Sequence, residues 1–268
     1  MEPTVKIALR AARTAGDIIA RSTERMDLVK VHEKEKNDFV TSVDSASEDE
    51  IREQLQRAFP EHNILGEEGG LVLGRGGESD TTWYIDPLDG TTNFMRGIPH
   101  FAISIACVRQ NRVEHAVVFD PIRQEEFVAS RGRGASLNGK RIRVSNQTEF
   151  NGALLGTGVP YRESQRPHVD GYMQCLQHIA THGAGVRRAG AAALDLAYVA
   201  AGRLDAFWEY GLRPWDVAAG MLLIQEAGGL IADFDGGDTC LEKGNVVCGP
   251  PKLFKQLLQV VHANLPGA

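Results

Sequence analysis

The chain has 268 residues, of which 43% are hydrophobic and 24% are charged, and its formal net charge is −6. That length is enough for a large core in one domain or two joined subdomains. The acidic balance argues against a protein whose main affinity comes from covering nucleic-acid phosphates with basic side chains. The sequence shows no membrane-spanning apolar run and no signal-peptide layout near its start, so we expect a cytoplasmic protein with no membrane partner.

The first hundred residues predict two helices and two short strands. Apolar residues at helical spacing indicate the first helix, and the pattern Ser45-Ala46-Ser47-Glu48 is that of a capping box that opens the second. Pro60 would end the second helix. The expected elements are helices over 4–25 and 45–59 and strands ending at 64–65 and 82–85.

From residue 101 the sequence changes to short β-like runs separated by turn residues. Asn138-Gly139 is a strong hairpin signal within them. The expected strands are 101–108, 113–119, 125–130, 204–210, 230–234 and 245–249, and the expected later helices are 166–182, 191–201, 214–227 and 251–264. This order predicts an α+β subdomain with an antiparallel sheet over residues 1–147 and an α/β subdomain over residues 148–268, joined in one compact unit.

The four cysteines, Cys107, Cys175, Cys240 and Cys248, form no C-x-x-C pair. Neither a zinc knuckle nor a thioredoxin-type site is therefore indicated. In a cytoplasmic chain we expect reduced thiols that serve mainly as packing residues.

The segment Asp86-Pro87-Leu88-Asp89-Gly90-Thr91 carries the strongest chemical signal. Two aspartates flank the dipeptide Pro87-Leu88, and Pro87 restricts the backbone before it, so both carboxylates can face the same space. Carboxylates are hard ligands that suit Mg²⁺ or Ca²⁺, and the helix start expected after Gly90 is a good place for a phosphate. Taken alone, the same residues are more typical of an acidic turn with a helix cap.

Two further acidic features favour a metal site. Glu67-Glu68 follows an apolar strand, and because neighbouring side chains diverge, one of the two glutamates is the candidate ligand. Asp216 is the polar exception near the start of an otherwise apolar helix. By itself each has an ordinary explanation, a solvated loop for the glutamates and an acid at a helix N-terminus for Asp216.

These motifs resemble the inositol monophosphatase family. The resemblance rests on Gly66-Glu67-Glu68, the run DPLDGTTNF at 86–94 and the pair Trp215-Asp216, and it extends over nearly the whole chain. The segments 187–209 and 211–216 are similar to bacterial SuhB-type members of the family. The resemblance implies a layered αβαβα sandwich, an antiparallel sheet first and a mixed α/β part second.

It also implies Mg²⁺ as the cofactor, with two to three ions. Glu67, Asp86 and Thr91 with the Leu88 carbonyl would hold the first ion, and Asp86, Asp89 and Asp216 the second. Glu67 could also reach a third. Thr91, oriented by Asp44, would help Glu67 activate the attacking water.

For the substrate, the resemblance implies contacts to phosphate from the backbone of Gly90 and Thr91, beside Asp89 and Asp216. Gly190, Ala192 and Glu209 match the positions that contact substrate hydroxyls. The family lysine matches either Lys34 or Lys36, and the divergent region 157–165 receives no assigned contact.

The expected function is Mg²⁺-dependent hydrolysis of a small phosphate monoester, with myo-inositol 1-phosphate as the favoured substrate and sensitivity to lithium. The alternatives are a related sugar or nucleotide phosphatase, or a regulatory binding protein with secondary phosphatase activity. For the regulatory role the resemblance implies RNA polymerase, NusA and the ribosomal RNA leader as partners in antitermination. A homodimer is also expected.

Overall fold

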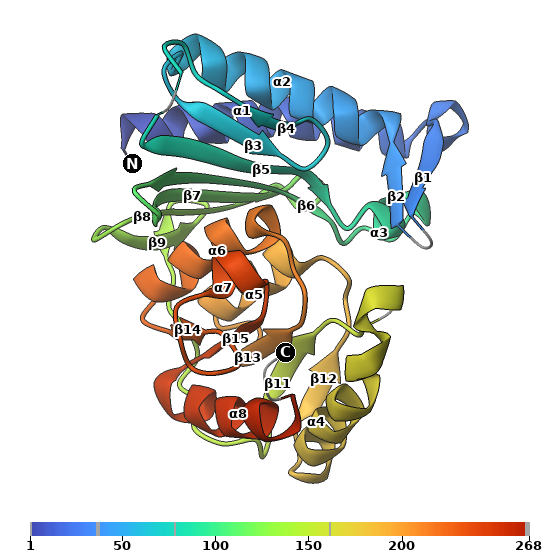
Figure 1. Ribbon diagram of the computed structural model, residues 1–268, viewed down its shortest axis with the longest axis vertical. Helices are drawn as coiled ribbons and strands as arrows, with labels where there is room; N and C mark the ends of the chain where they lie inside the picture. Colours follow the sequence, from blue (N-terminus) through green and yellow to red (C-terminus); the bar gives the residue numbers. More distant parts are fainter. Residues whose placement is uncertain (1, 36–37, 78, 161, 266–268) are drawn as a thin grey trace.

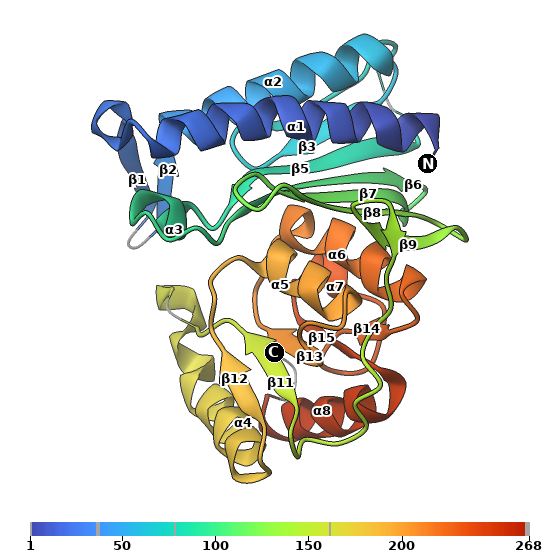
Figure 2. The ribbon, with the colours of Figure 1, turned by 180° about the vertical axis from the view of Figure 1, so that it is seen from behind.

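The structure, a computed structural model, describes residues 2–35, 38–77, 79–160 and 162–265. Its elements stack in five layers (Figure 1). Helices α1 (Pro3–Thr23) and α2 (Ser42–Ala58) cover one face of an eight-stranded sheet, and α5 (Ala192–Ala200) and α6 (Pro214–Glu226) lie against its other face. The same two helices lie against a five-stranded sheet, which α4 (Val169–Thr181) and α8 (Pro251–Asn264) cover from outside (Figure 2). The expected αβαβα sandwich is therefore confirmed.

The eight-stranded sheet has the order β10-β9-β8-β7-β6-β5-β3-β4. Its strands are β3 (Asn63–Gly66), β4 (Gly70–Val72), β5 (Thr81–Asp89), β6 (Ala102–Arg109), β7 (Arg112–Asp120), β8 (Glu125–Ser130), β9 (Gly134–Leu137) and β10 (Lys140–Arg141). The run from β5 to β10 is the expected antiparallel meander, and Asn138-Gly139 forms its last hairpin with both residues at positive φ. β3 pairs with β5 in parallel, so this sheet is mixed at one side.

The five-stranded sheet has the order β12-β11-β13-β15-β14 and combines parallel and antiparallel pairs. Its strands are β11 (Leu154–Thr157), β12 (Gly185–Arg187), β13 (Ala206–Glu209), β14 (Leu230–Ala232) and β15 (Val246–Gly249). The short helix α7 (Cys240–Lys243) precedes β15. This arrangement confirms the expected alternation of helix and strand in the last third of the chain.

Helices α5 and α6 form the centre of the molecule. Their residues share one core cluster with side chains of both sheets, which explains why α6 is apolar on nearly every side. Gly220 of α6 lies at a close approach of α5, because a Cβ there would meet Leu196 Cβ at 2.5 Å. The four cysteines are buried free thiols, as expected.

One expected helix start is wrong. α2 begins at Ser42, with Thr41 as its N-cap and Asp44 completing the capping box, and Ser45 lies inside the helix. Thr41 and Asp44 have the same spacing as Ser45 and Glu48, four positions earlier in the chain. Both side chains take part in the cap, and Asp44 is buried. As a result Ser47 and Glu48 lie on the buried face of α2.

Other differences are local. The expected helix over 166–182 begins with a 3₁₀ segment, Glu163–His168, since Pro167 interrupts the α-helical bonds. The strand expected to end at residue 85 continues to Asp89 across a bulge. The hairpin of β1 (Val31–Glu35) and β2 (Asp38–Thr41), the 3₁₀ turn Met26–Leu28, and β4, β11, β12 and α7 were not expected. Within the described ranges, no helix combines the length and the hydropathy needed to cross a membrane.

Candidate active site

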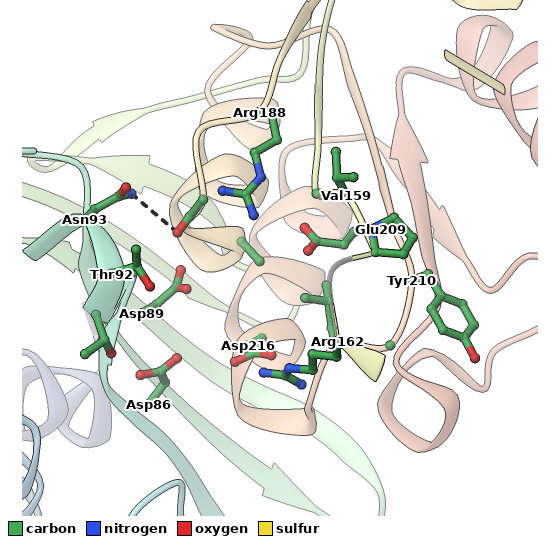
Figure 3. Close-up of a pocket in the computed structure, with 18 of the residues that line it drawn as sticks. Asp86, Asp89, Thr92, Asn93, Val159, Arg162, Arg188, Glu209, Tyr210 and Asp216 are labelled. Carbon is green, nitrogen blue, oxygen red and sulfur yellow. Dashed lines mark hydrogen bonds between the residues drawn. The ribbon is translucent and has the colours of Figure 1, made fainter. Parts of the chain in front are cut away.

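A cavity of about 410 Å³ opens between the end of β5 and the elements of the C-terminal half (Figure 3). Every predicted site residue lines it except Asp44, which lies behind its wall. These lining residues are Glu67, Asp86, Leu88, Asp89, Gly90, Thr91, Gly190, Ala192, Glu209 and Asp216. Segments more than one hundred residues apart in sequence thus meet at one place.

The end of β5 aims its two aspartates into this cavity. The pairing of β5 with β6 is irregular between Asp86 and Asp89, and Asp86 Oδ1 accepts a 2.9 Å hydrogen bond from Leu88 N–H inside the turn. Gly90 follows at φ 96°, and a Cβ there would meet His100 O at 3.0 Å. Glycine is therefore required both for the backbone angle and for the space.

Two buried residues of α2 fix the loops that carry the predicted metal ligands. Ser47 Oγ donates a 3.0 Å hydrogen bond to Pro87 O, near the end of β5. The Glu48 carboxylate accepts 2.8 Å hydrogen bonds from Glu68 N–H and Gly69 N–H, so it holds the loop after β3. The sequence analysis missed both roles, although polar residues on a helix face that is otherwise buried were a visible signal.

Asp44 supports the same turn. It is 1% exposed, and its Oδ1 accepts a 2.9 Å hydrogen bond from Thr91 Oγ1. Its other oxygen accepts from Thr41 N–H at 2.9 Å. Burial raises the pKa of Asp44, while these hydrogen bonds act in the opposite direction. Thr91 Oγ1 also lies 3.1 Å from the Leu88 carbonyl, so the hydroxyl has a fixed position at the cavity wall.

Four carboxylates repel one another across the cavity. Burial raises the pKa of Asp86 well above its ordinary value, and the nearby charges of Glu67, Asp89 and Asp216 raise it further. Burial and then Asp216 raise the pKa of Asp89. Asp86 is 2% exposed, so solvent does little to screen these charges.

This charge distribution fits divalent cations. Carboxylate and carbonyl oxygens are the ligands that Mg²⁺ takes in proteins, and cations among them would remove the mutual repulsion. In the part of the chain that the structure describes, no three His, Cys, Asp or Glu side chains are placed so that they could hold a metal ion as they stand. The four carboxylates therefore face a shared space without converging on one point.

Asp216 has two roles that the sequence offered as alternatives. It is the third residue of α6, and its Oδ2 accepts a 2.7 Å hydrogen bond from Arg213 N–H, so it caps that helix. Burial raises the pKa of Asp216, while the hydrogen bond from Arg213 N–H and the interaction with Asp86 act in the opposite direction. Asp216 therefore caps α6 and lines the cavity at the same time, so the helix-cap and metal-ligand explanations are compatible.

Glu209 at the end of β13 forms the far wall with Gly190 and Ala192. Burial, followed by the charge of Asp195, raises the pKa of Glu209 to about 8, and the nearby Arg188 opposes that shift. Figure 3 shows the Arg188 side chain close to Glu209 and the Arg162 side chain close to Asp216.

The sequence analysis missed part of this wall. Gly158, Val159, Pro160, Arg162 and Gln165 line the cavity, although the region 157–165 had been given no contact. Nothing in the motif set indicated those residues. The choice between Lys34 and Lys36 stays open, because Lys36 and the side chain of Lys34 lie outside what the structure describes.

Comparisons with known proteins agree with this architecture. The model of the inositol monophosphatase family matches residues 1–265. The Nus factor SuhB of Pseudomonas aeruginosa is 58% identical over 266 residues, which cover 99% of this chain and 98% of the relative. The chain belongs to the inositol monophosphatase family.

Solved structures give the same assignment. The extragenic suppressor protein SuhB from Bartonella henselae superposes with a TM-score of 0.93 at 37% identity and covers 100% of both chains. An inositol monophosphatase from Anabaena gives a TM-score of 0.84 at 35% identity, covering 97% of this chain and 95% of that one.

Proposed function

We propose that this protein hydrolyses a small phosphate monoester with Mg²⁺, and that myo-inositol 1-phosphate is its substrate. The observation that carries the proposal is the meeting of Glu67, Asp86, Asp89 and Asp216 from three separate chain segments in one cavity. Membership of the inositol monophosphatase family supports the same chemistry.

The proposed metal ligands are the four carboxylates, the Leu88 carbonyl and Thr91, for two to three Mg²⁺ ions. Bound there, the ions would neutralise the phosphate oxygens, acidify a water and stabilise the leaving alkoxide. Glu67 acts as the base toward that water. Thr91, whose hydroxyl is held by Asp44, orients it.

The polyol lies against the opposite wall. Glu209 accepts hydrogen bonds from substrate hydroxyls, and Gly190 and Ala192 leave room for the ring beside it. The backbone N–H groups of Gly90 and Thr91 bind the phosphate, and Asp89 and Asp216 also contact the substrate. Hydroxyl donors suit an acidic wall of this kind, because each can be paired with a carboxylate oxygen.

A phosphate-release screen tests the proposal. Sugar, polyol and nucleotide monophosphates are compared with Mg²⁺ present, for the wild type and for Asp89→Asn. We expect the fastest release from myo-inositol 1-phosphate and its loss in the variant, while circular dichroism stays unchanged. Lithium should also inhibit release, since it can occupy a site built for Mg²⁺. Wild-type turnover in Asp89→Asn would contradict the metal-site assignment.

The relatives favour a second function for the same chain. A full-length relative at 58% identity is named a Nus factor, so we propose a regulatory role in transcription antitermination, with RNA polymerase, NusA or the ribosomal RNA leader as partners. A pulldown from cell extract with wild type and Asp89→Asn tests it. We expect both proteins to retain transcription components, and retention by neither would contradict the role.

We also propose a cytoplasmic homodimer. Light scattering at micromolar concentration should give twice the mass of the 29.2 kDa chain. A monomer at that concentration would contradict this proposal without affecting the others.

A further inference from the structure

The amide of Asn93 joins two parts of the cavity wall that belong to different halves of the chain. Asn93 lies in α3 (Thr91–Met95), directly after the turn with Asp86 and Asp89, and is 8% exposed. Its Nδ2 lies 2.7 Å from His100 O, 2.9 Å from Ala189 O and 3.4 Å from Gly190 O, and it donates toward all three. Figure 3 draws one of these hydrogen bonds as a dashed line. One buried amide therefore links α3 to the segment 188–193, which we call the substrate segment.

Two more contacts cross the same boundary. Asp89 Oδ2 accepts a 2.7 Å hydrogen bond from Ala193 N–H at the start of α5. His100 Nε2 lies 3.6 Å from Asp195 Oδ1 in the same helix. The carboxylate that we propose as a metal ligand is thus bonded directly to the substrate segment.

The boundary also has little free space. A Cβ on Gly90 would lie 3.2 Å from Ala191 Cβ, and a Cβ on Gly190 would lie 3.4 Å from Asn93 Nδ2. Tight packing of this kind transmits a displacement from one side to the other. A change at the end of β5 or at Gly90 must therefore be accommodated in the substrate segment.

We propose that Asn93 is a positioning residue that couples metal binding at the turn 86–91 to the ordering of the substrate segment. The inference rests on the proposed function. A cation bound to the Asp89 carboxylate would restrict the motion of that side chain. The hydrogen bonds from Ala193 N–H to Asp89 and from Asn93 to Gly190 would then restrict the motion of the substrate segment, so that Gly190 and Ala192 meet the polyol in one conformation. Because such coupling is reciprocal, substrate strengthens Mg²⁺ binding by the factor by which Mg²⁺ strengthens substrate binding.

Hydrogen exchange measured with and without saturating Mg²⁺ tests the coupling independently of turnover. The proteins are wild type, Asn93→Leu, the milder Asn93→Ser in case the first variant folds poorly, and the control Asn264→Leu. Asn264 also donates from a side-chain amide to a carbonyl, at 2.8 Å from Val260 O, but on α8 away from the cavity. In wild type and control, Mg²⁺ should slow exchange both in 86–95 and in 188–193. In the Asn93 variants it should slow exchange in 86–95 alone.

Steady-state kinetics give the second measurement. At saturating Mg²⁺ the Asn93 variants should raise KM for the ester by about 5-fold or more, the lower range of measured couplings, with a smaller change in kcat. Equal Mg²⁺ protection of 188–193 in wild type and Asn93 variants overturns the coupling. Absence of Mg²⁺ protection in 86–95 of the wild type overturns the metal site itself, so the two failures are distinguishable.

Discussion

Thr91 and Asp44 are 47 residues apart in the sequence, yet Thr91 Oγ1 lies 2.9 Å from Asp44 Oδ1. The contact fixes the start of α3 against the first turn of α2, where Asp44 also completes the helix cap. One carboxylate therefore stabilises a helix start and orients the hydroxyl that we propose to act on the attacking water.

Thr91→Val removes the hydroxyl and keeps the shape of the side chain. We expect kcat to fall by about 10²-fold or more, the range for losing a group that takes part in proton transfer. Thr91→Ser keeps the hydroxyl and should retain most activity. Phosphate release with Mg²⁺ measures the effect, and a Thr91→Val enzyme within a factor of two of the wild type would contradict the assigned role.

Asp86→Asn should stabilise the metal-free protein and abolish its response to Mg²⁺. The change removes a buried charge that its neighbours repel, while the amide oxygen can still accept from Leu88 N–H. A gain of one kcal/mol raises the melting temperature of a chain of this size by about 2–4 °C. Thermal unfolding in chelator and in Mg²⁺ tests both statements. A variant less stable than the wild type in chelator would show that repulsion does not dominate at Asp86.

Glu209→Gln should change how stability depends on pH. Burial raises the pKa of Glu209 from 4.5 to about 8, so the folded protein binds a proton that the unfolded chain has lost between those values. Stability from this group is fully present below pH 4.5 and is lost as the pH rises to about 8. In chelator, the melting temperature of Glu209→Gln minus that of the wild type should therefore increase from pH 4.5 to about 8. Above pH 8 this difference should stay constant. A constant difference at all pH values would contradict the shift.

Gly220→Ala tests the contact between α5 and α6. The new methyl group would clash with Leu196, so we expect a loss of about 1–3 kcal/mol, typical of overpacking a core. Chemical denaturation measures the loss, and kcat at low temperature should change little because Gly220 lies outside the cavity lining. An unchanged unfolding midpoint would contradict the close packing of α5 against α6 at Gly220.

The long periodic elements could be predicted from the sequence, and so could the carboxylates. Residues 4–25 and 214–227 follow helical periodicity because each buries a continuous face, and their observed bounds differ from the predicted ones by about two residues. The acidic residues were found because charge inside an apolar helix or at a strand end is visible without a structure.

The remaining features depend on contacts between distant residues. β12 lies at the edge of the five-stranded sheet and β11 lies next to it. Both strands are short, and pairing with their neighbours stabilises them more than their intrinsic strand propensity does. The sequence placed Glu48 in a capping box, whereas its carboxylate accepts hydrogen bonds from Glu68 N–H and Gly69 N–H, which lie 20 and 21 residues further along the chain. The Asn93 amide donates to the carbonyls of Ala189 and Gly190, which lie 96 and 97 positions further along the chain, and no local sequence pattern predicts such a contact.

The most direct test of the central claim is the rate of phosphate release from myo-inositol 1-phosphate by chelator-treated protein as Mg²⁺ is added back. We expect no release in excess chelator and a rate that rises with Mg²⁺ to a plateau, with no recovery in Asp89→Asn. Release that continues undiminished in chelator, or no release from any phosphate monoester at any Mg²⁺ concentration, would contradict it.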